Sequence, residues 1–84
     1  MEQRAKIRNT LAHLLKGEKA VIDAFTDEAM SLKLLDLGCT PGSDVSLERR
    51  APLGDPIAIN VSGQTISMRM EEASTVLIRL VSNK

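Results

Sequence analysis

The sequence predicts a mainly β fold with short helices: a small antiparallel barrel of five strands, with one helix inserted between the first and second strands. Three segments, 44–50, 57–61 and 65–70, alternate apolar and polar residues and are separated by short turn sequences. They predict a three-stranded meander, the smallest antiparallel unit that buries one face. Two further apolar segments, 18–25 and 76–81, flank the meander and provide the strands that would close it into a barrel.

Size and composition limit what such a domain can do. We expect residues 1–9 to be an N-terminal extension and residues 10–84 to form one domain. With one Phe, no Tyr and no Trp, the core must be filled by aliphatic side chains and Met. Eleven basic and eleven acidic residues cancel, which argues against nucleic-acid binding. A single Cys predicts a reducing compartment, and no apolar run approaches the roughly 20 residues of a membrane span. We therefore expect a cytoplasmic protein without direct membrane insertion.

The first half of the domain contains both predicted helices. Thr10 is predicted to cap a short helix over residues 11–15 that ends at Gly17. The strand 18–25 follows, and Thr26 or Asp27 then caps a second helix that runs to about Leu37. Its core-facing stripe is predicted to contain Met30, Leu34 and Leu37, with Leu32 and Leu35 beside it.

Glycine and proline mark the turns of the second half. Gly38 is placed to end the helix in a left-handed conformation, and Pro41-Gly42 fits a type II turn. The loop 51–55 is longer than a hairpin requires, and Pro56 suits the first position of a strand. Ser62-Gly63 predicts a tight hairpin turn with positive φ. Residues 71–75 are expected to form one 3₁₀ turn with Ala73 facing inward.

The residues that carry chemistry do not form a recognisable site. His13 is expected to be solvated on the first helix, and Cys39 to be a small, partly buried hydrophobe. One Cys and one His cannot build a closed zinc site, and the carboxylates lack the spacing of a calcium loop. The sequence contains no phosphate-binding glycine loop and no nucleophile with an assignable base. We predict no catalytic residues, no metal ligands and no cofactor.

Two other features allow a binding role but do not require one. Arg49 and Arg50 form a weak basic patch, for which solvated arginines at the barrel rim are the simpler interpretation. Met68 and Met70 alternate in step with Ile66, which predicts core positions. A groove for Pro-rich peptides would need aromatic side chains that this chain lacks.

An ordered set of motifs resembles the FeoA family of ferrous iron transport proteins, which have an SH3-like barrel. The set begins with Thr10-Leu11 and Lys16-Gly17-Glu18, and continues with residues 34–38 and Thr40-Pro41-Gly42. It is completed by residues 50–56 and by Met68-Arg69 with Glu71-Glu72-Ala73. The chain departs from the family pattern at Cys39, where a longer apolar residue is usual, and at Lys33, where Arg is frequent.

The resemblance implies an accessory role with FeoB, a membrane ferrous iron transporter that has a cytoplasmic G-protein domain. The chain would then act through protein contact, at the inner face of the membrane through its partner. We predict that the docking surface includes Arg50, Pro52, Leu53, Gly54 and Asp55, because this loop is expected to be exposed.

Two alternatives stay open. One is a regulatory module related to the SH3-like C-terminal domain of iron-dependent repressors, which would need a separate DNA-binding partner. The other is an activator of GTP hydrolysis that supplies Arg49 or Arg50 to its partner. The sequence does not determine the oligomeric state, although edge strands of small barrels can self-associate.

Overall fold

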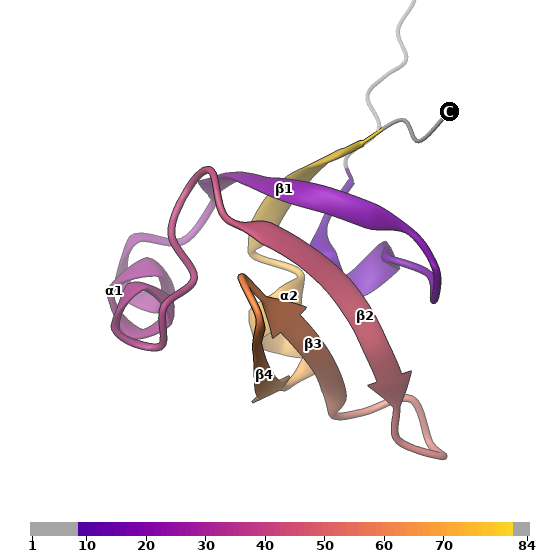
Figure 1. The fold of residues 1–84 in the computed structure, drawn as a ribbon. Coiled ribbons are helices and arrows are strands. Elements are labelled where there is room, and N and C mark those ends of the chain that lie inside the picture. Colours follow the sequence, from indigo (N-terminus) through magenta and orange to yellow (C-terminus); the bar gives the residue numbers. More distant parts are fainter. Residues whose placement is uncertain (1–8, 82–84) are drawn as a thin grey trace, which may run out of the picture.

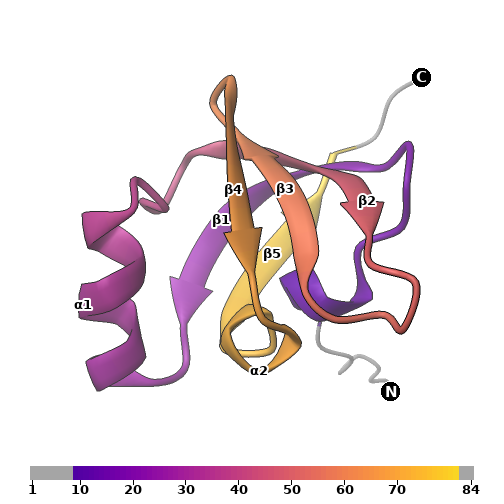
Figure 2. The ribbon, with the colours of Figure 1, turned by 90° about the horizontal axis from the view of Figure 1, so that it is seen from below.

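The computed structural model describes residues 9–81. Five antiparallel strands form one curled sheet in the order β4-β3-β2-β1-β5 (Figures 1 and 2). The bounds of the strands are Lys19–Phe25 (β1), Asp44–Arg50 (β2), Ile57–Val61 (β3), Gln64–Met68 (β4) and Val76–Leu80 (β5). Helix α1 (Glu28–Asp36) lies between β1 and β2 in the sequence and to one side of the sheet in space. The predicted fold class is confirmed.

The core fills the inside of the curled sheet with aliphatic side chains. Pairing of β3 with β4 and of β2 with β3 places the inward residues of three strands on one face. Among the least exposed side chains are Leu11, Leu14, Ile22, Leu34, Ile57, Ile59, Met68, Val76 and Cys39. The only Phe, Phe25, is half-buried and packs against this cluster.

The N-terminal helix differs from its prediction. It is a 3₁₀ helix over Leu11–His13 (η2), not an α-helix over residues 11–15. The Thr10 hydroxyl does not cap it; instead, Oγ1 lies 3.1 Å from Nδ1 of His13, while the Thr10 backbone forms a bridge to Leu77 of β5. Spacing by three residues brings Leu11 and Leu14 onto one side of a 3₁₀ turn, and both are buried. Tertiary pairing and burial therefore override the local helical pattern.

Helix α1 begins and ends as its sequence predicts. Asp27 is the N-cap and accepts a hydrogen bond from the Met30 amide at 2.9 Å. At the other end Gly38 has φ +100°, the Cys39 amide donates to Leu34 O, and the Gly38 amide donates to Leu35 O. This pair of bonds is a Schellman motif.

The apolar stripe of α1 is narrower than predicted. Leu34 is fully buried and Met30 is half-buried, but Leu37 is 43% exposed and Leu32 is 67% exposed. The placement of Leu37 on the core face was therefore wrong. The helix lies at the side of the barrel rather than across it (Figure 2), so only a narrow strip of its surface reaches the core.

The chain after β4 also differs in detail. Strand β4 ends at Met68, and Met70–Ala73 form one turn of α-helix (α2), which replaces the predicted 3₁₀ turn. Met70 begins this helix, so its prediction as a strand residue was wrong, although its half-buried side chain packs against the core. The cause is local, because the Arg69 amide donates to the Glu72 carboxylate at 2.9 Å and starts the helix there. The Ser62-Gly63 turn has the predicted positive φ values, 50° and 96°.

Candidate docking surface

A β-bulge near the end of β2 decides which of two arginines faces the protein interior. Leu47 pairs with Ile59, Arg49 with Ala58 and Arg50 with Ile57, so the register shifts between residues 47 and 49. If side chains alternated strictly from Leu47, Arg49 would face inward. The extra residue of the bulge shifts the alternation by one, so that Arg50 lies on the same inner face as its partner Ile57. Arg49 is left exposed on the outer face.

The guanidinium of Arg50 makes contacts within the protein. Its Nη2 donates to the carbonyl oxygen of Leu14 at 2.8 Å, and Nη1 lies 3.6 Å from the sulfur of Met70. These contacts hold the segment after η2 and the start of α2 against the end of β2. The prediction of two solvated arginines was therefore wrong for Arg50.

The loop from 51 to 55 is closed by its own backbone and presents an apolar tip. The Gly54 amide donates to Ala51 O at 2.8 Å, and the Ala51 amide donates to Pro56 O at 3.0 Å. Gly54 has φ +91°, which an L side chain rarely adopts. Pro52 and Leu53 lie at the tip, and Leu53 is 95% exposed.

Asp55 closes the loop on the side of α2. Its Oδ1 accepts a hydrogen bond from the Met70 amide at 3.0 Å, and its Oδ2 lies 3.9 Å from Nη1 of Arg69. An acceptor on the first amide of α2 satisfies one of the donors that a helix leaves free at its start. The peptide bond from Asp55 to Pro56 is cis.

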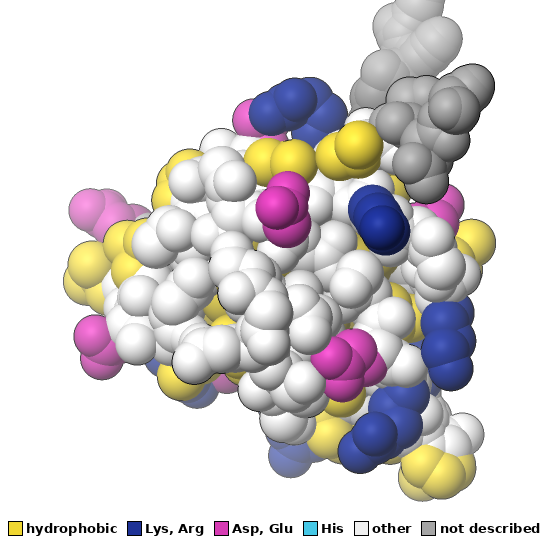
Figure 3. Space-filling model, viewed as in Figure 1, with side chains coloured by type: hydrophobic (Ala, Val, Ile, Leu, Met, Phe, Trp, Pro, Cys, Tyr) yellow, Lys and Arg dark blue, Asp and Glu magenta, His cyan; other side chains and the backbone are white. Residues whose placement is uncertain are grey.

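The five residues predicted for docking therefore lie together but face different ways. Arg50 and Asp55 bind neighbouring segments, Gly54 shapes the turn, and Pro52 and Leu53 face outward. The predicted docking set did not include three exposed cations around this loop: Lys16, Arg69 and Arg49, the last of which was noted only as part of a weak basic patch. Figure 3 shows basic side chains near the apolar tip of the loop, at the lower right. The contacts of Arg50 and Asp55 join segments distant in the sequence, so no local sequence signal indicates the whole set.

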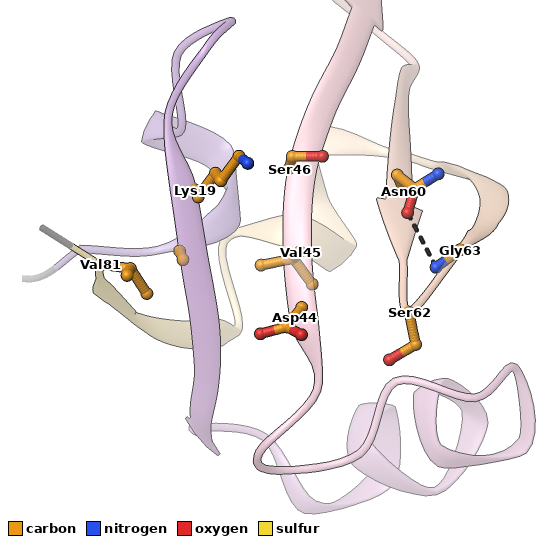
Figure 4. Close-up of a pocket in the computed structure, with 9 residues that line it drawn as sticks. Lys19, Asp44, Val45, Ser46, Asn60, Ser62, Gly63 and Val81 are labelled. Atoms are coloured by element: carbon orange, nitrogen blue, oxygen red, sulfur yellow. Dashed lines mark hydrogen bonds between the residues drawn. The ribbon is translucent and has the colours of Figure 1, made fainter. Parts of the chain in front are cut away.

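A hollow lies on the outer face of the sheet, and the sequence analysis did not single it out. It has a volume of about 380 Å³ and is lined by Lys19, Ser46, Asn60 and neighbours at the Ser62-Gly63 turn (Figure 4). Lys19, Ser46 and Asn60 form one cross-strand row. The Asn60 amide is already used, because Oδ1 accepts from the Gly63 amide and Nδ2 donates to Glu48. The Asn60 side chain is therefore not free to bind a ligand in this hollow.

Hydrogen bonds favour the charged form of two carboxylates near these surfaces. Hydrogen bonds from Asn60 and Thr65 lower the pKa of Glu48. The hydrogen bond from Lys33, together with that from the Arg69 amide, lowers the pKa of Glu72. Both carboxylates are thereby kept ionised.

Neither Cys39 nor His13 has the surroundings of a catalytic group. Burial raises the pKa of the Cys39 thiol, so the thiolate needed for nucleophilic attack is disfavoured. His13 is exposed and lies on η2, as predicted.

Between residues 9 and 81, no three His, Cys, Asp or Glu side chains converge in a way that would hold a metal ion. In the same part of the chain, no helix has the length and apolar character to cross a bilayer.

A family profile and a curated relative both indicate the same family. A family profile described as the FeoA domain matches residues 9–80. A fusion of Fe(2+) transport protein A and the Fe(2+) transporter FeoB from Porphyromonas gingivalis is 28% identical over 74 residues. That match covers 87% of this chain and 9% of the fusion protein, so the chain spans a small part of this curated relative.

Solved structures agree with the family profile. A FeoA-like protein from Clostridium acetobutylicum is 27% identical, with a TM-score of 0.83 over 92% of this chain and 91% of the other. A Stenotrophomonas maltophilia FeoA in complex with zinc, described as a procaryotic SH3 domain protein, is 26% identical with a TM-score of 0.74. That match covers 84% of this chain and 89% of the other, and the predicted SH3-like class is confirmed. A manganese-dependent transcriptional repressor matches 93% of this chain with 39% of its own, at a TM-score of 0.79. At 15% identity this last likeness is one of fold alone.

Proposed function

This chain belongs to the FeoA domain family, and we propose that it is a small cytoplasmic accessory protein of ferrous iron uptake. In this proposal it acts by binding an FeoB-type membrane transporter and its G-protein domain. The observation that carries the proposal is the Porphyromonas gingivalis relative, in which both parts belong to one protein. Fusion raises the effective concentration of two modules for each other, as expected when they work in contact.

The proposed docking surface is the loop 51–55, with Leu53 as the central contact. A leucine that is 95% exposed at the tip of an internally bonded loop, beside the exposed Pro52, presents apolar area that a partner can cover. Arg50 and Asp55 support this tip through their contacts with Leu14 and Met70. Their part in docking is to fix the shape of the loop, whereas Pro52 and Leu53 make the contact.

The test is binding of the purified chain to the FeoB-type transporter of the same host, measured for wild type and single variants. We expect Leu53→Ala to weaken binding without changing the fold. Leu32→Ala is the matched control, because it removes another exposed leucine from α1. If only Leu32→Ala weakened binding, the contact would lie on the helix and the loop assignment would be wrong. If wild type failed to bind, the accessory role itself would be refuted.

The same partner could also be regulated through its nucleotide hydrolysis. Of the two candidate arginines, only Arg49 has a guanidinium that faces solvent. We expect any stimulation of GTP hydrolysis to be lost in Arg49→Ala. Hydrolysis that is the same with and without the chain would remove this version of the function.

The second candidate function is a regulatory module that works with a metal-dependent repressor, and the fold likeness favours it. The two candidates differ in what the chain binds. Co-purification with a repressor but not with a membrane GTPase would favour this candidate over the transporter.

A further inference from the structure

The charges of this chain cancel in total but are separated along the molecule. The segment from the middle of β1 through α1 to the start of β2 carries five carboxylates against one lysine, and that lysine, Lys33, is paired with Glu72. The five are Asp23, Asp27, Glu28, Asp36 and Asp44. Around the loop 51–55 the exposed cations Lys16, Arg49 and Arg69 outnumber the exposed carboxylates, which are Asp55 in the loop and Glu71 in α2.

Specific contacts bring these three cations to one end. The bond from Arg50 to Leu14 O places the turn that contains Lys16 beside the end of β2, where Arg49 lies. The contact between Asp55 and Arg69 adds the cation that precedes α2. Two nearby carboxylates are held in place by backbone amides, since Glu18 accepts from the Leu15 amide and Asp55 from the Met70 amide, but both keep their negative charge.

We propose that this end of the molecule, a tip of Pro52 and Leu53 rimmed by Lys16, Arg49 and Arg69, binds a protein surface in which carboxylates surround an apolar depression. The inference deepens the proposed function and rests on it, because it names the chemistry of the docking partner. The loop is bonded within itself and anchored at both ends. Little conformational freedom is therefore lost when the tip enters a depression, which favours affinity.

The charge separation also orients the encounter. An acidic partner attracts the cationic rim and repels the acidic end that carries α1, so the tip is turned toward the partner as the two proteins approach. Arginine adds selectivity for carboxylates, because its planar fork binds them in a bidentate manner.

A protein surface fits these features better than an anionic bilayer. A bilayer takes up many apolar and basic side chains without regard to shape, and stable attachment needs more than one strong signal. Here the tip offers one leucine and one proline, and the Asp55 side chain, 43% exposed, would face the lipid phosphates. On a protein partner, a cation can be placed opposite this carboxylate.

The experiment measures binding of the full chain to the FeoB-type transporter of the same host over a series of salt concentrations. We expect affinity to fall as salt rises, and Arg49→Glu to weaken binding by about tenfold or more at low salt. Arg79→Glu makes the same charge change on the exposed face of β5, and we expect it to leave binding unchanged. Leu53→Ser should weaken binding at every salt concentration and keep the salt dependence of wild type. Thermal unfolding of each variant confirms that the barrel is intact.

The outcomes separate this inference from the proposed function. If the affinity does not change with salt and is the same for Arg49→Glu and Arg79→Glu, the inference is overturned and the accessory role is unaffected. No binding by the wild type overturns both. Two further results would overturn the inference, because they would show that the cationic rim serves a contact other than the one with the transporter. One is binding of the chain to phosphatidylserine vesicles that Arg49→Glu abolishes. The other is self-association at low salt, measured by sedimentation, that the same variant abolishes.

Discussion

The loop 51–55 and helix α1 both expose leucines, but they are attached to the barrel in different ways. The loop has no fully buried side chain and is held by polar bonds from Arg50 and Asp55. The helix is held by one fully buried side chain, Leu34, and by the ion pair of Lys33 with Glu72 at 2.6 Å. The loop thus depends on polar anchors, whereas the helix combines a buried leucine with an ion pair.

This difference teaches which positions can be changed without harm. The residues that face outward, Leu53 and Leu32, are available for binding, while those that point inward determine the shape of each region. Five substitutions test this division, from the largest expected effect to the smallest.

Leu34→Ala should have the largest effect. Removing a fully buried leucine from a core typically costs about 2–5 kcal/mol of unfolding free energy, and here it also removes the apolar anchor of α1. Chemical denaturation measures the loss, with Leu32→Ala as the exposed control. Equal stability of the two variants would show that α1 does not depend on Leu34.

Arg50→Ala should come next. The change leaves the Leu14 carbonyl without its charged donor, and a hydrogen bond to a charged group is worth about 1.5–3 kcal/mol. We expect a lower denaturation midpoint than for Arg49→Ala, which removes an exposed arginine from the adjacent position. The assignment of Arg50 to the interior fails if the two variants are equally stable.

Asp55→Ala should cost about 1 kcal/mol, because the first amide of α2 loses its acceptor. Asp55→Asn keeps an oxygen at this position and should lose less. The comparison is made by thermal unfolding, and amide exchange at Met70 gives a local measure. Unchanged exchange at Met70 in Asp55→Ala would contradict the capping role.

Glu72 should contribute a small pH dependence. Its pKa is lower in the folded protein than the ordinary value near 4.5, so its stabilising effect is present above that pH and is lost as the pH falls through the lowered pKa. Glu72→Gln should therefore flatten the loss of stability on acidification below about pH 4.5. Glu71→Gln, on the exposed side of the same turn, should behave as wild type. Identical acid profiles for Glu72→Gln and wild type would exclude the contribution.

Leu53→Ala should leave stability within about 0.5 kcal/mol of wild type, because the side chain has almost no contact with the rest of the molecule. The same denaturation measurements check this. A larger loss would mean that the tip supports the fold, and its use as a binding probe would fail.

The alternating segments were sufficient to predict most of the architecture. Apolar residues at every second position placed β2, β3 and β4 within about two residues of their observed bounds. Gly38 and Asp27 marked the ends of α1, because caps and left-handed turns depend on local chemistry. Thr10 was misjudged because its backbone pairs with Leu77, which is distant in the sequence. Met70 was misjudged because the bond between the Arg69 amide and the Glu72 carboxylate starts a helix where the alternating pattern suggested a strand.

The central meander, the aliphatic core and an exposed loop at 51–55 were thus determined by the sequence itself, since each follows from periodicity or local turn chemistry. The place of β5 beside β1 was not, because it joins segments at opposite ends of the domain. Only the tertiary structure decided which arginine turns inward, because one bulged residue in β2 reverses the alternation of everything after it. It also decided that Arg50 and Asp55 support the loop while Lys16, Arg49 and Arg69 surround its tip. These contacts join residues up to 36 positions apart, and no local pattern encodes them.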